Sequence, residues 1–279
     1  MDDIKLFVCC HAETPIPEHP LLVPIQVGAT LADRRFPGFV QDDSGVNISE
    51  KNRSYCELTA QYWAWKNCSA DYCGFFHYRR FLYPEQSERR PYIICEKPSA
   101  PLLEKLGYEG FDKLIRNCDL ILPIGENMHV PVREHYAHAP YHHGEDLERM
   151  EQIVREYSPD YAAAMDRYLS GTIHYFGNIY IMRREVFRDY CAWLFPLLEE
   201  FDRRTDTGGY GVQEKRVDGY LAVRLLGVYC TKHHGELRCL ELPRVHFEPD
   251  RKKRRKAEMI NFLLPPGSKR RARVKKRVK

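Results

Sequence analysis

Short apolar runs alternate along the chain with segments of helical periodicity. Five runs have the length of a buried strand and are bounded by polar, Gly or Pro residues; they cover residues 4–10, 23–29, 72–78, 119–124 and 176–182. A strand that is covered on both faces needs such a run, because each face must be apolar. These five segments are therefore predicted to form the centre of a sheet.

Helical periodicity fills the intervals between these runs. Apolar residues recur at i, i+3, i+7 and i+10 in residues 55–65 and again in 147–157, the spacing of an amphipathic helix. Three further helices are predicted over residues 158–169, 184–201 and 216–227. Strands that alternate with helices predict an α/β fold in which helices flank a mostly parallel central sheet.

Charge divides the chain into two parts. Of the 279 residues, 43% are apolar, which is enough for one domain with a sizeable core. Residues 251–279 carry fourteen Lys and Arg residues and one acid, which leaves residues 1–250 with 29 basic and 38 acidic side chains. We expect a single domain over residues 1–250 and a basic tail after it. Within the domain, the Pro-, Ser- and charge-rich residues 85–103 are expected to form an exposed excursion, such as a mobile lid.

The tail starts at Arg251, ends at Lys279 and places cationic clusters on both sides of the apolar residues 259–264. This combination predicts adsorption to an anionic membrane surface. Nucleic acid is the rival partner, but the acidic domain would repel phosphate backbones, so no nucleic-acid partner is expected. A solvated, disordered tail is the third alternative.

The N-terminal sequence and the cysteines indicate a cytoplasmic protein. Asp2 and Asp3 stand where a secretory signal needs cations, and the apolar run that follows is too short for such a signal. The ten cysteines are scattered and form no CxxC pair, so we expect reduced thiols rather than disulfides or zinc ligands. The expected location is the inner face of the plasma membrane, with peripheral attachment through the tail.

The first candidate site is the aromatic run at residues 71–81, which ends in His77, Arg79 and Arg80. The carboxyl end of a strand is where α/β enzymes place reactive groups. Alternation along an extended chain puts His77 and Arg79 on one face and Arg80 on the other. Guanidinium groups hold a diphosphate through bidentate hydrogen bonds. Ion pairs with nearby carboxylates, and a buried structural histidine, are the alternative interpretation.

A second candidate is the polar turn cluster at residues 41–52, which contains Asp43, Asn47, Ser49 and Asn52. These side chains would line a nucleotide or sugar pocket. The alternative is that they bond the backbone of their own turn or cap the next helix, as Asp, Asn and Ser side chains commonly do.

The third candidate is the histidine-rich run that begins at His135, ends at His143 and is followed by Asp146. His138 and His142 are spaced at i and i+4, as in helical zinc sites, but a proline between them disfavours a regular helix. A general base or an acceptor-binding loop is the favoured interpretation, because a carboxylate beside imidazoles removes a hydroxyl proton near neutral pH. Asp146 would otherwise only complement the dipole of the following helix.

Six ordered segments within residues 4–248 resemble the capsular and exopolysaccharide biosynthesis family catalogued as domain of unknown function 4422. These segments begin at Ile25 (IQVG), Asp42 (DDSGVNIS), Tyr55 (YCELTA, with YWAWKN after it), His77 (HYRR), His135 and Asp189 (DYCAWLF). The resemblance implies a bacterial glycosyltransferase with the GT-A fold. It further implies a hexosyl transfer from a nucleotide-sugar, with a UDP-sugar as the expected donor.

The resemblance also implies residue roles. The expected donor-binding residues are His11, Gln26, Asp43, Asn47, Ser49, Asn52 and Glu57. His77 ends the strand at which other GT-A enzymes carry a metal-binding DxD triplet, and no DxD triplet occurs in this chain. Arg79 or Arg80 is therefore expected to stabilise the leaving diphosphate without a metal site, and a divalent metal stays open as an alternative.

One position departs from the family pattern. Where the family is expected to read Gly-Phe-x-x-Glu-Arg-Leu-Leu, this chain has Gly219, Tyr220 and, in place of the Glu, Val223. If that Glu has a catalytic role in relatives, the role has moved in this chain, for example to Asp218, or has been lost.

These observations predict an enzyme that adds a sugar to a lipid-linked or polymeric glycan acceptor for capsule, exopolysaccharide or lipopolysaccharide. The expected catalytic residues are His77, Arg79, Arg80, His142 and Asp146, and the expected acceptor contacts are His138, Asn178 and Asp218. A metal-dependent hydrolase built on the histidine run is one alternative. A non-enzymatic, polyanion-binding scaffold that uses the basic tail is the other.

Overall fold

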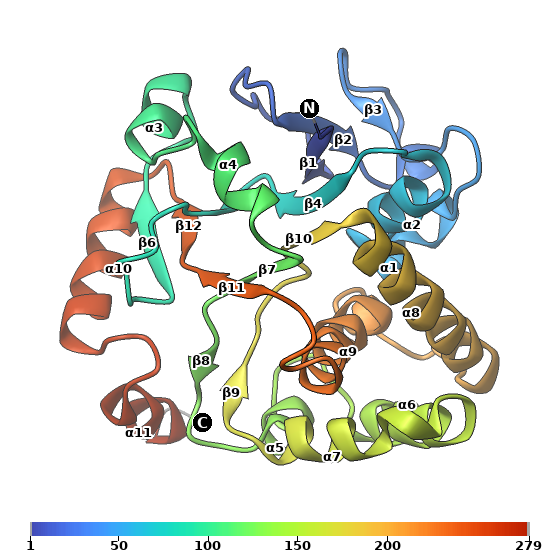
Figure 1. Ribbon diagram of the computed structural model, residues 1–279. Helices are drawn as coiled ribbons and strands as arrows, with labels where there is room; N and C mark the ends of the chain where they lie inside the picture. The colour runs from blue at the N-terminus through green and yellow to red at the C-terminus, as the bar shows by residue number, and fades with distance from the viewer. Residues whose placement is uncertain (1, 278–279) are drawn as a thin grey trace.

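A ten-stranded sheet forms the centre of the computed structural model, which describes residues 2–277 (Figure 1). Its main path runs in the order β3, β2, β1, β4, β10, β7, β11. These strands are β3 (Val40–Gln41), β2 (Leu22–Gln26), β1 (Ile4–Cys10), β4 (Tyr72–His77), β10 (Tyr180–Arg183), β7 (Leu120–Pro123) and β11 (Cys239–Leu242). Only β10 is antiparallel to its neighbours on this path, so the predicted α/β fold with a mostly parallel sheet is confirmed.

Three short strands extend the sheet beyond β4. They are β5 (Arg80–Leu82), β12 (Arg244–Phe247) and β6 (Tyr92–Cys95), and β12 pairs with both of the others. The prediction of a mobile excursion over residues 85–103 is therefore wrong at its centre, because β6 is held in the sheet by its ladder to β12. A separate two-stranded sheet joins β8 (Glu126–Asn127) to β9 (Ile173–His174).

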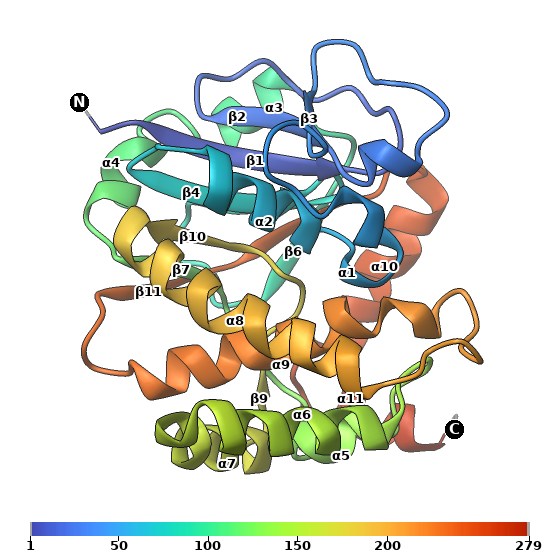
Figure 2. The same cartoon turned by 90° about the vertical axis from the view of Figure 1, so that its right-hand side faces the viewer.

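Helices cover both faces of the sheet (Figures 1 and 2). One face is covered by α1 (Asn52–Tyr55), α2 (Leu58–Asn67), α8 (Arg184–Arg204) and α9 (Val217–Lys232). A further layer, made of α5 (Val132–Ala137), α6 (Gly144–Tyr157) and α7 (Ala162–Ser170), packs on the outer side of α8 and α9 (Figure 2). The other face of the sheet carries α3 (Ala100–Lys105), α4 (Phe111–Arg116), α10 (Arg251–Leu263) and α11 (Lys269–Arg277). Short 3-10 turns are η1 (Ala29–Leu31), η2 (Ser49–Lys51), η3 (Pro159–Tyr161) and η4 (Glu214–Arg216).

The apolar run of β1 supplies both hydrophobic cores. Phe7 and Cys9 pack in the core beneath the larger helical layer, whereas Leu6, Val8 and Cys10 pack in the core on the opposite face. Side chains of a strand point alternately to its two faces, so a continuous apolar run is what a doubly covered strand requires.

Three predicted segments differ from the structure. The strand predicted over residues 176–182 starts only at Tyr180, because Gly177 has a φ of +79°, which does not fit an extended strand. The helix predicted over residues 55–65 is broken between α1 and α2 at Cys56, which has a φ of 53°. Within the basic tail predicted over residues 251–279, Arg251–Leu263 form α10 and Lys269–Arg277 form α11, while residues 278 and 279 lie outside the described residues.

None of the helices within residues 2–277 has the length and apolar character needed to cross a bilayer.

Candidate active site

A cleft of about 500 Å³ opens at the carboxyl ends of β1 and β4. Its lining residues come from five separate segments and are Cys9, His11, Val27, Asn52, Arg53, Cys56, Glu57, His77, Arg79, Val212, Gln213, Lys215 and Arg216. In open α/β sheets, ligands bind in the crevice outside the carboxyl ends of the strands. The strand end that the sequence singled out, at His77, therefore lies in a cleft.

The charge of this cleft is strongly cationic. Arg53, Arg79, Lys215 and Arg216 line it, and Glu57 is its one acidic residue. Within residues 2–277, none of these four cations forms an ion pair with a carboxylate. Converging cations without carboxylate partners attract an anion such as a diphosphate.

His77 is held as a neutral imidazole. Burial, followed by the nearby charges of Arg80 and Arg79, lowers the pKa of His77 to about 3. Its Nδ1 accepts a hydrogen bond of 3.2 Å from the backbone N–H of Arg79. Because a neutral imidazole carries one proton, that proton lies on Nε2, and His77 can donate a hydrogen bond to a ligand atom.

His11 reaches the cleft from the end of β1. Its ring lies 6.2 Å from that of His77, measured between centroids. Burial first, and then the charges of Arg79 and Arg216, lower the pKa of His11. Both imidazoles therefore add hydrogen-bonding capacity to the cleft without adding charge at neutral pH.

Arg80 lies at the edge of the site rather than among its lining residues. The chain turns back after His77, and Arg80 opens β5 directly opposite His77 in an antiparallel pair. Side chains of directly opposed residues project to the same face. The predicted separation of His77 and Arg80 onto opposite faces is therefore wrong, because the extended chain does not continue through this turn.

The break between α1 and α2 places Glu57 in the cleft. Its Oε1 accepts a hydrogen bond of 2.8 Å from Nδ2 of Asn178, which also donates to the carbonyl of Gly219 at 3.2 Å. Asn178 is buried, so its amide orients the Glu57 carboxylate instead of meeting solvent. Asn178 was predicted as an acceptor contact, and the structure places it behind Glu57.

Cys56 connects this break to the cationic wall. Its Sγ lies 3.3 Å from Nε of Arg216, which donates to it. Burial first, and then the Glu57 charge, raise the pKa of Cys56 to about 12, so the thiol stays protonated at neutral pH. Its backbone, at φ 53° and ψ −126°, occupies a region that favours glycine. The strained turn thus orients Glu57 and holds Arg216 beside it.

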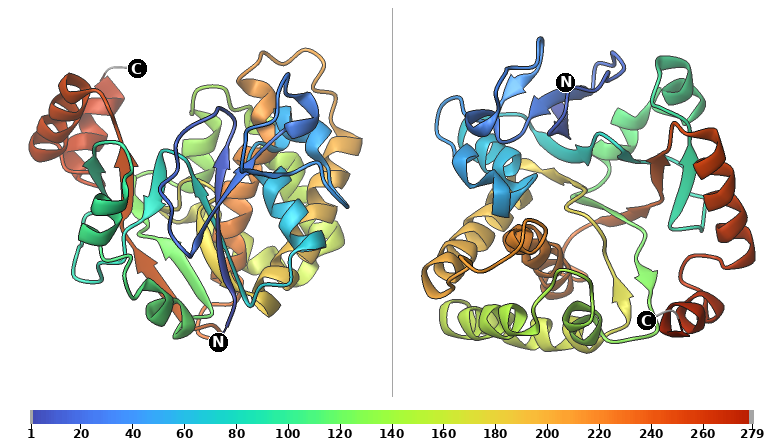
Figure 3. Two further views of the ribbon diagram at one scale, coloured as in Figure 1. Left: turned by 90° about the horizontal axis from the view of Figure 1, so that it is seen from above. Right: turned by 180° about the vertical axis from the view of Figure 1, so that it is seen from behind.

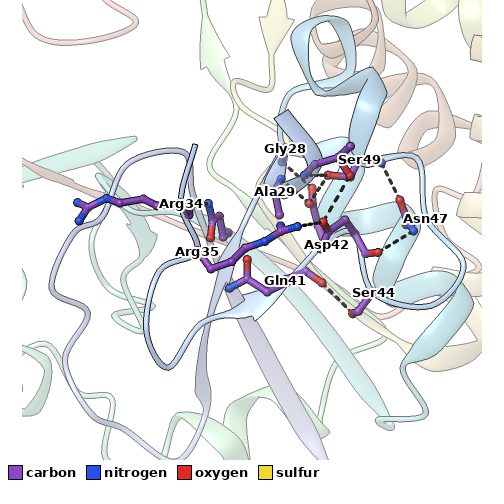
Figure 4. A network of polar contacts seen from close by, with 12 residues as sticks. Gly28, Ala29, Arg34, Arg35, Gln41, Asp42, Ser44, Asn47 and Ser49 are labelled. Carbon is purple, nitrogen blue, oxygen red and sulfur yellow. Dashed lines mark hydrogen bonds and ion pairs between the residues drawn. The ribbon is translucent and has the colours of Figure 1, made fainter. Parts of the chain in front are cut away.

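Asp42 organises the turn cluster behind the cleft (Figure 4). Its carboxylate accepts hydrogen bonds from the backbone N–H groups of Gly28 and Ala29, at 2.8 and 2.9 Å. The hydroxyls of Ser49 and Thr59 donate to it as well, each at 2.6 Å. Gly28 has a φ of +65°, which glycine adopts without strain. This network fixes the turn after β2 against α2.

Most predicted donor-binding residues of this region bond to the protein itself. Gln26 braces the loop at residues 34–36 through its amide, and Ser49 is buried against Asp42. Asn47 donates to the carbonyls of Asp43 and Gly45, while Asp43 pairs with Arg35. Of the predicted donor-binding residues, His11, Asn52 and Glu57 line the cleft.

The histidine-rich run does not converge on one point. His138 lies just beyond the end of α5, and its Nδ1 contacts the carbonyl of Glu134 at 2.8 Å. His142 stacks on Tyr220 at 4.0 Å between ring centroids, and burial lowers its pKa to about 4. None of the residues 135–146 lines the cleft.

The two remaining predicted carboxylates are buried. Asp146 accepts a hydrogen bond of 2.8 Å from the hydroxyl of Tyr210, and burial raises the pKa of Asp146. Asp218 accepts a hydrogen bond from Ser54 beneath α1. Burial first, and then the Asp202 charge, raise the pKa of Asp218 to about 8. Neither carboxylate lines the cleft.

Sequence reasoning missed much of the cationic wall. Arg53 lies in α1, directly after the turn cluster, and Lys215 and Arg216 precede α9, where the sequence indicated only a helix start. The available signal was the glycine-rich stretch at residues 208–211 followed by adjacent cations. A flexible loop beside a helix start is a common place for anion-binding groups.

The cleft residues do not form a metal-ligand set. Within residues 2–277, no three His, Cys, Asp or Glu side chains are grouped so that they could hold a metal ion. Glu57, the one carboxylate of the cleft, is bonded to Asn178. Hard divalent cations take several oxygen ligands, which this cleft does not bring together.

Comparisons with known proteins agree with this architecture. A profile of the family described as Domain of unknown function (DUF4422) matches residues 5–234. No curated protein sequence matches the chain. Among solved structures, the apo structure of the WbbM bifunctional glycosyltransferase is similar, with 31% sequence identity and a TM-score of 0.84. The match covers 88% of this chain and 46% of that chain, so this chain spans about half the length of the bifunctional protein.

Proposed function

Because the chain belongs to the DUF4422 family and is similar to a solved glycosyltransferase, we propose that it transfers a sugar from a nucleotide-sugar donor to a glycan acceptor. One observation carries this proposal. Several cations that have no carboxylate partner within the described residues meet a single carboxylate in one cleft at the carboxyl ends of β1 and β4. That combination suits a reaction whose leaving group is a diphosphate and whose nucleophile is a hydroxyl.

The diphosphate of the donor lies against Arg79 and Arg216 in this proposal. Both guanidinium groups are exposed in the cleft and remain charged at physiological pH. The Nε2 proton of His77 supplies a neutral hydrogen bond to the same group. Arg80, beside His77 at the edge of the cleft, adds to the positive potential. These side chains offset the charge that develops on the leaving diphosphate.

Glu57 takes the proton of the acceptor hydroxyl. The hydroxyl oxygen attacks the anomeric carbon of the sugar, and the bond from that carbon to the diphosphate oxygen breaks. The bonding electrons leave with the nucleoside diphosphate, and the hydroxyl proton moves to the Glu57 carboxylate. Asn178 is a positioning residue in this scheme, because its amide holds Glu57 at 2.8 Å.

The acceptor is a lipid-linked or polymeric glycan of a capsule, exopolysaccharide or lipopolysaccharide, and the donor is a UDP-hexose. These finer assignments rest on the family resemblance, since pocket geometry alone does not name a sugar. The cationic wall offers the diphosphate a metal-independent site, so transfer should persist in EDTA.

The test is a thermal-shift panel of UDP-, GDP-, CMP- and dTDP-sugars, followed by a transfer assay in EDTA. A bound nucleotide-sugar raises the unfolding temperature by an amount that grows with the logarithm of its excess over Kd, so the nucleotide that binds most tightly should stand out. Glu57→Gln should keep this shift and lose about a thousandfold in kcat. Asp146→Asn, a matched change outside the cleft, should keep kcat. No shift with any nucleotide-sugar, or activity that depends on added manganese, would contradict the proposal.

A further inference from the structure

The outward face of α10 combines cations with exposed apolar side chains. Phe262 is 85% exposed, and Met259 and Leu263 are each 58% exposed. Arg251, Lys252, Arg255 and Lys256 are exposed along the first half of the helix. We call these seven residues the α10 patch. At 100° per residue they fall on one side of the helix, so cations lead into apolar side chains along one continuous face.

A groove lies beside the α10 patch. It has a volume of about 1020 Å³ and runs between α10 and the segment that enters β6. Met259, Phe262 and Ile94 contribute apolar surface, while Arg89, Arg90 and Arg255 contribute cations. Glu258 adds one acid to the lining, and Arg90 forms an ion pair with Glu88. The groove therefore repeats the pairing of apolar and cationic groups seen on the patch.

The inner side of α10 is fixed to the fold. The Asp250 side chain caps the helix by accepting from the N–H groups of Lys252 and Lys253, at 2.8 and 3.0 Å. Near its other end, Asn261 accepts from the hydroxyl of Tyr92 on β6 at 3.1 Å and from Arg271 on α11 at 2.7 Å. The patch is thus the outer surface of an anchored helix.

We propose that the α10 patch and its groove dock the protein on an anionic phospholipid bilayer. The cations face the headgroup phosphates, and Phe262, Met259 and Leu263 enter the boundary between headgroups and acyl chains. Residues 1–250 carry 29 basic and 38 acidic side chains and are repelled by the same surface. That opposition of charge selects one orientation of the protein on the bilayer.

This orientation brings the cleft close to the lipid. The N–H of Phe247, at the end of β12, donates to the carbonyl of Arg79 at 2.9 Å. Arg251 follows only four residues later, a reach of roughly 13 Å at most for an extended chain. Figure 3 (left) shows β1 running away from the N-terminus toward one end of the sheet. The helices α10 and α11, in red, lie beyond that end. A docked molecule therefore holds Arg79 near the bilayer surface, where a lipid-linked substrate is anchored.

Vesicle flotation tests the docking separately from sugar transfer. The full chain should float with vesicles of phosphatidylcholine and phosphatidylglycerol in equal amounts and not with phosphatidylcholine alone. Arg255→Glu with Lys256→Glu should lower this partition about tenfold or more, and Phe262→Ser about tenfold. Arg167→Glu with Arg188→Glu, the same charge change on exposed residues of α7 and α8, should leave it unchanged, as should Tyr157→Ser on α6.

Several outcomes would overturn the docking proposal. They are failure of the wild type to float, equal flotation with neutral vesicles, and equal losses in patch and control variants. Loss of RNA binding by the patch variants with unchanged vesicle flotation would assign the patch to nucleic acid instead. Because flotation needs no donor or acceptor, its result is independent of the proposed transfer reaction. All substituted residues are exposed, so cooperative unfolding at the wild-type temperature confirms that each variant is folded.

Discussion

The turn cluster at residues 41–52 and the cleft are both dense in polar side chains, but only the cleft leaves its cations without carboxylate partners. In the turn cluster, the Asp42 carboxylate is occupied by four donors from the protein. In the cleft, Arg79 and Arg216 have no carboxylate partner within residues 2–277. A cluster of polar side chains therefore indicates a binding site only where those side chains are not already hydrogen-bonded or ion-paired within the protein.

The strongest test of this contrast is removal of the cleft cations. Arg79→Ala with Arg216→Ala should lower kcat/KM for the donor by about 10⁴, since one lost electrostatic contact to the reacting group commonly costs about 10² or more. The free energy of unfolding should change by less than about 0.5 kcal/mol, because both side chains are exposed. Steady-state kinetics and chemical denaturation measure the two quantities. Arg80→Ala serves as the control and should lower kcat/KM only about tenfold, because Arg80 lies at the edge of the cleft. A loss in kcat/KM as large as that of the double variant would place Arg80 in the cleft.

A substitution in the turn cluster should instead lower the stability of the fold. Asp42→Ala should lower the free energy of unfolding by about 3 kcal/mol, because it leaves the N–H groups of Gly28 and Ala29 without their acceptor. Asp43→Ala, which removes the ion pair with the exposed Arg35 and a long hydrogen bond of 3.5 Å from the hydroxyl of Thr30, should change it by less than about 0.5 kcal/mol. Urea denaturation measures both. Equal effects would show that the turn does not depend on the buried carboxylate.

A smaller effect concerns the pH dependence of stability. The pKa of His77 is about 3 in the folded protein, whereas an unfolded histidine titrates near 6.5. Below pH 6.5 the unfolded chain binds a proton that folded His77 does not, so this residue lowers stability by up to about 1.4 kcal/mol per pH unit as the pH falls. His77→Gln should remove this contribution. Denaturation of both proteins between pH 7 and pH 4 tests it, and parallel curves would contradict it.

The smallest expected effect is backbone strain at the edge of the cleft. Gly28, which donates to Asp42 of the turn cluster, has a positive φ that glycine tolerates, whereas Cys56 at the edge of the cleft has a φ of 53°. Cys56→Gly should therefore be about 1 kcal/mol more stable than Cys56→Ala, the reverse of the order in ordinary backbone. Thermal unfolding of the two variants decides the point. A more stable Ala variant would mean that the turn relaxes without cost.

The amino-acid sequence determined the order and class of the main elements. Apolar runs at residues 4–10 and 72–78 predicted β1 and β4, because strands covered on both faces must be apolar throughout. The same reading located His77 and Arg79 at a strand end. The apolar pattern did not predict β6 or β12. Each has only four residues and is stabilised by pairing with its partner strand rather than by the hydrophobic pattern of its own residues.

Only the tertiary structure decided which polar residues share a site. Arg53, Arg79 and Arg216 are far apart in the chain and meet because α1, the end of β4 and the start of α9 converge. The break at Cys56, which turns Glu57 into the cleft, contradicts the helical periodicity around it. The spacing of apolar residues along a segment indicates which face of a helix or strand is buried. The partners of a charged side chain depend on how distant segments pack together, and the spacing of residues within one segment does not encode that packing.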